Sequence, residues 1–162
     1  MTSPRSQLVD SSSPGYFHCV SRCVRRAFLC GFDAPSGKDF EHRRGWVEDR
    51  LLELAECFAI GIYAYAVMSN HLHVVAHVNP CVAAEWSAED VARRWVRLFP
   101  VRELGEIDAE ACQLRAQVLA GDPNRIAELR GRLASLSWFM RCLCGPIARR
   151  ANGEDGCTGR FW

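Results

Sequence analysis

A segment without a single charged residue, 57–84, constrains the fold of this chain more than any other feature. It contains no Asp, Glu, Lys or Arg, so most of it has to lie inside the protein or pair with another strand. Within it, two runs rich in β-branched and aromatic residues, 59–68 and 71–78, are separated by Ser69-Asn70. Two such runs joined by a short polar pair predict a β-hairpin.

The other predicted elements place this hairpin in the order β-α-β-β-α. They are a strand at 16–28, a loop at 31–37, a helix from residue 39, the hairpin, a helix capped by Ser87, a short helix at 106–120 and a helix from Asp122-Pro123. The last helix has an amphipathic stripe that reaches residue 147, and Gly131 or Pro146 could interrupt it. This order predicts an α+β, ferredoxin-like fold, in which helices cover one face of an antiparallel sheet. Residues 159–162 only begin a fourth strand, so we expect the last strand to be largely missing.

The composition fits one soluble domain. Hydrophobic residues make up 49% and charged residues 24% of the chain, and the net charge of +1 gives no overall field that attracts nucleic acid. Lys38 is the only lysine among 20 basic residues, and arginine grips phosphate at two points, although a GC-rich genome produces the same bias. Nine cysteines include no Cys-x2-Cys pair. Residues 1–14 form a flexible lead without the apolar core of a secretory signal, and no run approaches the ~18 apolar residues that span a membrane, so we expect a cytoplasmic protein with reduced thiols.

Two histidines give the hairpin a chemical face. His71 and His73 are two residues apart on the second strand, so they point to the same side with Cα atoms about 6–7 Å apart. Leu72, Val74 and Ala76 fall on the other side, which is apolar. Two imidazoles at this spacing suit one shared metal ion, and Mg²⁺ or Mn²⁺ accepts two of them together with oxygen donors and water. Because the hairpin contains no carboxylate, a third ligand has to come from another element.

Other histidines and one amide have different relations to this pair. Asn70 adds a polar group directly beside it. His18 is on the first predicted strand, which this fold places next to the histidine strand, so His18 is a candidate neighbour. His77 shares the face but lies about 13 Å from His73, and we expect it to be a surface residue of the sheet.

The length of the hairpin loop decides which residues of the first strand stand beside the histidines. A loop of two or four residues pairs Ala66 with His73, and directly opposed residues share a face. Ala64 and Ala66 then leave room for a substrate next to the histidines. Tyr63 and Tyr65 are expected on the opposite face, as core or under-sheet residues. A loop of three residues would reverse this.

These segments resemble a known family. Residues 64–75 resemble the strand–turn–strand signature of the IS200-like tyrosine transposases, including the relatives associated with repetitive extragenic palindromes: a hydrophobic strand, Met, Pro or Ser, Asn, His, any residue, His, then aliphatic residues. The weaker similarities are to the first strand of the family (15–22), the helix before its fourth strand (138–152) and the opening of that strand (159–162). The resemblance implies a single domain over 15–162, in which 85–132 is a helical insertion.

The resemblance also implies a chemistry. In this family the histidine pair and a third polar ligand hold Mg²⁺ or Mn²⁺ at a scissile phosphate of single-stranded DNA. A tyrosine on a later helix attacks the phosphate and forms a 5′-phosphotyrosine link, and DNA hairpins at the element ends are recognised. His71 and His73 would be the metal ligands here, and DNA the partner. Six arginines are candidate phosphate contacts as well as candidate solvated surface charges: Arg22, Arg25, Arg26, Arg141, Arg149 and Arg150.

The chain departs from the family pattern in its nucleophile. The family tyrosine lies on a helix after the fourth strand, whereas this sequence stops at Trp162 and has only Tyr16, Tyr63 and Tyr65. No catalytic residue can be assigned, and we expect a truncated transposase domain that binds metal and single-stranded DNA without strand transfer. The family includes dimers and monomers, so a homodimer stays open. The alternatives are a non-catalytic remnant that binds DNA hairpins and a structural protein that binds zinc.

Overall fold

The computed structural model describes residues 13–24 and 28–162. Most of the predicted flexible lead therefore lies outside the described residues. In chain order the elements are β1 (Gly15–Arg22), β2 (Phe32–Asp33), β3 (Lys38–Asp39), α2 (Arg43–Cys57), β4 (Ile60–Val67), β5 (His71–Val78), α3 (Pro80–Glu85), α4 (Ala88–Leu98), β6 (Arg102–Glu103), β7 (Glu106–Ile107), α5 (Ala109–Ala120), α6 (Pro123–Leu133) and α7 (Leu136–Glu154).

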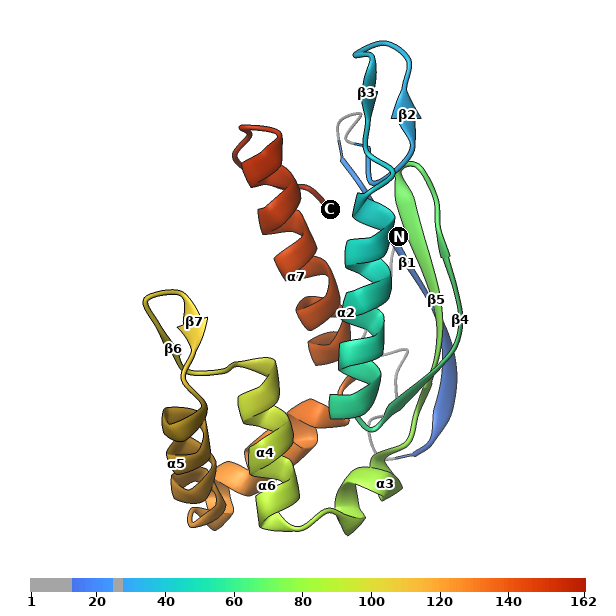
Figure 1. Cartoon of the computed structure of the whole chain (residues 1–162). Coiled ribbons are helices and arrows are strands. Elements are labelled where there is room, and N and C mark those ends of the chain that lie inside the picture. The colour runs from blue at the N-terminus through green and yellow to red at the C-terminus, as the bar shows by residue number, and fades with distance from the viewer. Residues whose placement is uncertain (1–12, 25–27) are drawn as a thin grey trace.

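The fold is α+β, as predicted, and the charge-free segment forms its central hairpin. Strands β1, β5 and β4 make an antiparallel sheet in that order, with β5 in the middle. Helices α2 and α7 lie side by side over one face of this sheet, and α3 to α6 gather at one end of the molecule (Figure 1). Among the residues that the structure describes, no helix lies over the other face of the sheet (Figure 1).

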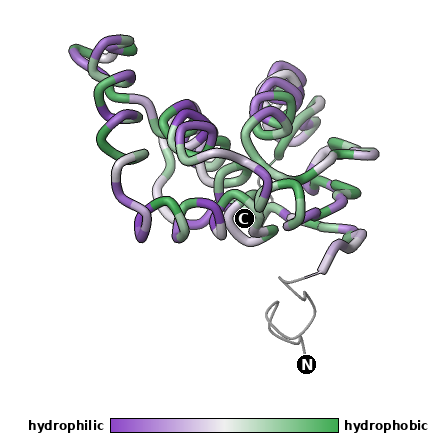
Figure 2. Tube along the Cα trace, turned by 90° about the horizontal axis from the view of Figure 1, so that it is seen from below, coloured by the Kyte–Doolittle hydropathy of each residue, from purple (hydrophilic) through white to green (hydrophobic). Residues whose placement is uncertain are grey.

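The strict alternation of β5 explains why one face is covered and the other is not. Leu72, Val74, Ala76 and Val78 are at most 1% exposed and pack beneath α2 and α7. The residues between them are only half-buried. Burial of the larger aliphatic side chains, Leu72, Val74 and Val78, stabilises the fold by about 1.5–3 kcal/mol each. Along the helices in Figure 2 the tube changes repeatedly between hydrophilic and hydrophobic colour, as expected for helices with one face in a core.

The helical region beyond β5 begins and ends where local signals indicate, with two additions. The hydroxyl of Ser87 accepts from the amide of Asp90, whose carboxylate accepts from the amide of Ser87, so a complete capping box starts α4. Helix α3 and the hairpin β6–β7 were not predicted. The turn of that hairpin, Leu104-Gly105, has positive φ at both residues (50° and 93°), which is typical of a type I′ turn. Helix α4 packs against α2, α5 and α6.

The last helix, predicted to start at Asp122-Pro123, is divided into two helices, α6 and α7. The break falls at Ala134-Ser135, where Ser135 caps α7, and Pro146 lies inside α7 without ending it. Residues 159–162 form no strand. Instead, Phe161 is buried at 3% exposure, and its carbonyl accepts from the backbone amide of Val24. None of the helices in the described ranges is long and apolar enough to cross a membrane.

Candidate metal and nucleic-acid site

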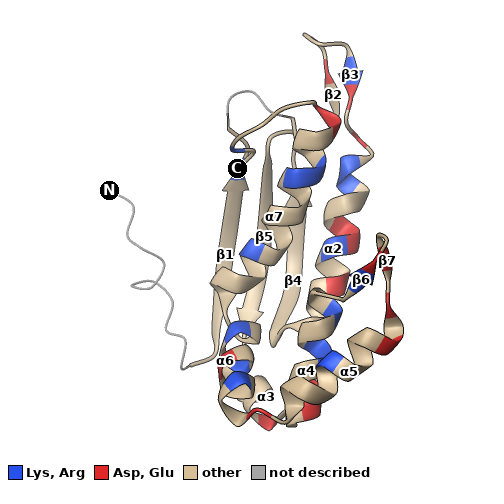
Figure 3. Cartoon of the chain, turned by 90° about the vertical axis from the view of Figure 1, so that its left-hand side faces the viewer, with Lys and Arg blue, Asp and Glu red and all other residues tan. Residues whose placement is uncertain are grey.

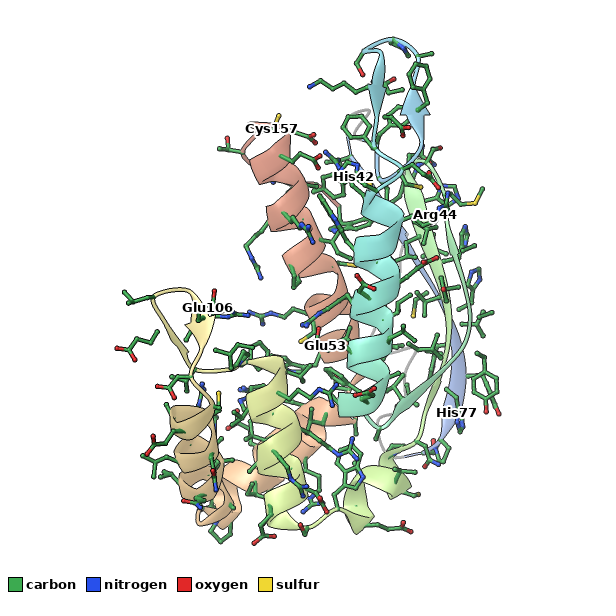
Figure 4. All side chains as sticks on the ribbon, viewed as in Figure 1. His42, Arg44, Glu53, His77, Glu106 and Cys157 are labelled. Carbon is green, nitrogen blue, oxygen red and sulfur yellow. The ribbon has the colours of Figure 1, made fainter. Side chains whose placement is uncertain are left out.

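The uncovered face of the sheet carries the histidines. His71, His73 and His77 alternate along β5 with the buried aliphatic residues and are half-buried. In Figure 4 the His77 side chain points away from the helices, to the outer side of the sheet. The part of β1 that pairs with this strand adds His18 to the same face, because His18 lies opposite Val75. The central strand therefore presents its imidazoles to solvent.

The orientation of His71 is set by its neighbour. Nδ1 of His71 lies 2.7 Å from Oδ1 of Asn70. The amide oxygen is an acceptor only, so Nδ1 carries the proton and donates. In the neutral ring with this tautomer, Nε2 of His71 keeps its lone pair, which is the form that binds a metal ion. Asn70 thus does for His71 what carboxylates and carbonyls do for the histidine ligands of known metal sites.

His73 has an equivalent partner on β1. Its Nδ1 lies 2.8 Å from Nε2 of His18, and the two rings stack with centroids 5.1 Å apart. One of these nitrogens donates to the other. When His73 is the donor, its Nε2 is free, as in His71, and the two free nitrogens belong to rings with centroids 4.8 Å apart. The structure thus places Asn70 and His18 beside the pair, in positions to orient it.

The residues present fit part of a metal site. Across residues 13–24 and 28–162, no three His, Cys, Asp or Glu side chains are grouped so that they could hold one ion. The pair therefore supplies two nitrogen ligands. Water and phosphate oxygens are the remaining donors that Mg²⁺ or Mn²⁺ accepts.

The predicted hairpin register is confirmed. Ala66 pairs with His73 and Ala64 with Val75. Both alanines are exposed, so small side chains flank the histidines and leave room there. Tyr65 pairs with Val74 and faces the helical side, as predicted, but it is 45% exposed and is not a core residue.

The prediction for Tyr63 is wrong. The ladder shifts between Ile62, which pairs with Ala76, and Ala64, so Tyr63 is an extra residue in a β-bulge. Its ring packs edge-on against His77 with centroids 6.1 Å apart and is 63% exposed. Tyr63 therefore lies on the histidine face. Alternation along an unbroken strand gave no warning of this.

A cluster that sequence reasoning missed follows from this bulge. The Tyr16 ring stacks on His77 with centroids 4.3 Å apart and meets Tyr63 edge-on at 5.3 Å. The Tyr16 hydroxyl lies 3.4 Å from that of Tyr63 and donates to it, and this hydrogen bond raises the pKa of Tyr16. The sequence contained one sign of this cluster: Tyr16 and His18 are two residues apart on one strand, which places both on the same face.

The candidate phosphate contacts separate into two groups. Arg22 pairs in register with His71 and is exposed, so it lies beside the histidine pair. Arg25 and Arg26 lie outside the described residues.

The three arginines of α7 belong to the helical layer. Arg150 lies over the Trp46 ring at 3.9 Å and Arg141 over Trp138 at 5.0 Å, and Arg149 is exposed. Because α7 covers the opposite face of the sheet (Figure 1), these side chains cannot share a phosphate with His71 and His73. If these three arginines contact DNA, they do so on a surface separate from the histidine pair.

The cysteines behave mainly as buried apolar residues. Burial raises the pKa of the Cys23 thiol to about 12 and also raises the pKa of Cys30, Cys57 and Cys142. Thiols held neutral in this way are weak metal ligands, because zinc binds the thiolate.

Comparisons with protein-family models, with curated proteins and with solved structures gave no match. The chemistry of the chain is therefore inferred from the geometry of this sheet and from its sequence motif.

Proposed function

We propose that this chain is a single-stranded-DNA-binding domain of the kind used in DNA transposition, in which His71 and His73 hold Mg²⁺ or Mn²⁺ against a phosphate of the DNA. The observation that carries the proposal is the pair of imidazoles on the uncovered face of the central strand. Asn70 orients one ring and His18 the other. The resemblance of residues 64–75 to the IS200-like tyrosine transposases names the reaction class.

The surroundings of the pair suit a polyanion. The three long strands contain no Asp or Glu, and Arg22 is their only permanently charged residue. A divalent ion at the pair would supply positive charge that polarises a phosphate oxygen. His71 and His73 would bind that ion, and Arg22, opposite His71, would contact a neighbouring phosphate.

The tyrosines of the chain support binding more than cleavage. Tyr16 and Tyr63 contact His77, which is about 13 Å along the strand from His73. Tyr65 is on the other face of the sheet. None of them is beside the histidine pair, so we expect this chain alone to form no covalent link with DNA.

Metal binding and DNA binding by the same protein test this proposal. Calorimetric titration with Mn²⁺ should show binding to the wild type, and the double substitution His71→Ala and His73→Ala should weaken it by at least tenfold. His42→Ala is the matched control, because His42 lies on the helical side and pairs with Glu154. Fluorescence anisotropy with a labelled, hairpin-flanked single strand should show tighter binding with Mn²⁺ than with EDTA, and only the double variant should lose this difference.

Two results would change the conclusion. DNA affinity that is equal with Mn²⁺ and EDTA, and is untouched by the double substitution, would favour the alternative of a non-catalytic DNA-binding protein. A covalent protein–DNA adduct on a denaturing gel would contradict the placement of the tyrosines.

A further inference from the structure

Three rings form an exposed aromatic cluster on the uncovered face, at the opposite end of β5 from His71. Tyr16 comes from β1, Tyr63 from the bulge of β4 and His77 from β5, so each strand of the sheet contributes one ring. The centroid distances are 4.3 Å for Tyr16–His77, 5.3 Å for Tyr16–Tyr63 and 6.1 Å for Tyr63–His77. The rings thus contact one another while their outer sides stay free.

The cluster is unusual in its exposure. Tyr16 is 64% and Tyr63 is 63% exposed, and Val20, further along β1, is 53% exposed. Large aromatic side chains bury much apolar area when they find a partner, so an exposed group of them marks a contact surface. No helix within residues 13–24 and 28–162 covers this surface in Figure 1.

The charge of the face indicates what kind of partner fits. The long strands are almost free of blue and red in Figure 3, and among their residues only Arg22 carries a permanent charge. A second copy of the same face would bring like charges together and offer no carboxylate in return. A negatively charged partner with flat apolar groups matches the face better.

We propose that Tyr16, Tyr63 and His77 form a stacking platform for the bases of single-stranded DNA. This inference rests on the proposed function, because the same strand would have a phosphate at His71 and His73, about 13–20 Å away along β5. Unpaired bases stack on aromatic side chains displayed by open sheets, and stacking tolerates any sequence because every base has a π-face. The role assigned to the platform is binding, because the rings lie about 13–20 Å along β5 from the histidine pair.

The test separates stacking from attraction to phosphate. The probes are a labelled twelve-residue oligothymidylate and an abasic oligonucleotide of the same length and charge, titrated by fluorescence anisotropy in EDTA. The test variant combines Tyr16→Leu with Tyr63→Leu. The matched control is Tyr65→Leu, because Tyr65 is an exposed tyrosine on the same strand as Tyr63 but on the other face of the sheet. Urea denaturation confirms that each variant is folded.

We expect the wild type to prefer the oligothymidylate over the abasic strand by about tenfold or more. The double tyrosine variant should lose this preference, and Tyr65→Leu should keep it within twofold. The preference should also survive His71→Ala with His73→Ala in EDTA, so the platform can be confirmed even if the metal-dependent function fails.

Equal affinity of the wild type for the two strands would overturn the platform while leaving the histidine site intact. A preference that persists in the double tyrosine variant would overturn it as well. If the wild type binds neither strand but forms a dimer in sedimentation velocity that the tyrosine variant does not form, the face is an interface between copies of this chain and the proposal is wrong.

Discussion

Replacing Arg43 with Met should cost the protein a large part of its stability. This side chain is 0% exposed and joins segments that are far apart in the chain. Its guanidinium donates to Glu154 Oε2 at 2.9 Å, to the Phe28 carbonyl at 2.9 Å and to the carboxylate of Asp155. It also lies 4.2 Å from the centroid of the Phe40 ring. One residue thus fastens the start of α2 to the end of α7 and to the segment before β2.

The size of the effect follows from the exposure of its partners. Removing one member of a buried ion pair costs about 3–5 kcal/mol. Here the carboxylates of Glu154 and Asp155 are 38% and 23% exposed, so water replaces part of the hydrogen bonding that they lose with the guanidinium. The Phe28 carbonyl also loses its donor, at a cost of about 1–3 kcal/mol. We expect a loss of about 3 kcal/mol in the free energy of unfolding, equivalent to about 6–12 °C in Tm for a chain of this length.

Equilibrium urea denaturation followed by far-UV circular dichroism measures this loss. Arg93→Met is the control, because its side chain is 72% exposed and pairs with Asp90 on the same helix; it should cost less than about 0.5 kcal/mol. A loss below about 1 kcal/mol for Arg43→Met, with an unchanged slope against urea, would refute the view that this cluster holds the two helices together.

Two further changes test local features of the fold. Gly131→Ala in α6 should raise the free energy of unfolding by about 0.5–1 kcal/mol, because a Cβ there meets no atom within 4 Å; a decrease in the urea midpoint would contradict this. Raising the pH from 8 to 10 should lower the free energy of unfolding, because burial raises the pKa of Cys23 from the ordinary thiol value of 9.0 to about 12. The stability that the neutral Cys23 thiol contributes is complete below pH 9 and is lost as the pH rises from there toward 12. Cys23→Ala should therefore reduce the dependence of the unfolding free energy on pH. An unchanged pH dependence in this variant would exclude Cys23 as its source.

Local patterns predicted the elements that depend on neighbouring residues. The alternation of Leu72, Val74 and Ala76 with the histidines predicted both the strand and its buried face, and the short loop at Ser69-Asn70 predicted the register. Ser87 and Asp122 predicted helix starts, because their side chains cap amides only two or three residues away. In each case the cause lies within a few positions of the effect.

Features that depend on distant partners were not predictable in this way. The burial of Arg43 requires Glu154, which is 111 positions away. Pro146 stays inside α7, a helix that packs against α2 and so has support beyond its own hydrogen bonds. The place of Tyr63 depends on one extra residue in β4, and the almost uniformly apolar sequence of this strand does not show where that residue falls.

That extra residue has a consequence for how the face can be altered. If Tyr63 were deleted, Ile62 would be followed directly by Ala64, and the alternation of the strand would become regular. Ile60, Ile62 and Val67 would keep their places in the core. The bulge therefore places the side chain of residue 63 on the open face without changing the face on which any other residue of β4 lies. A substitution at this position can change ligand preference while the core stays the same.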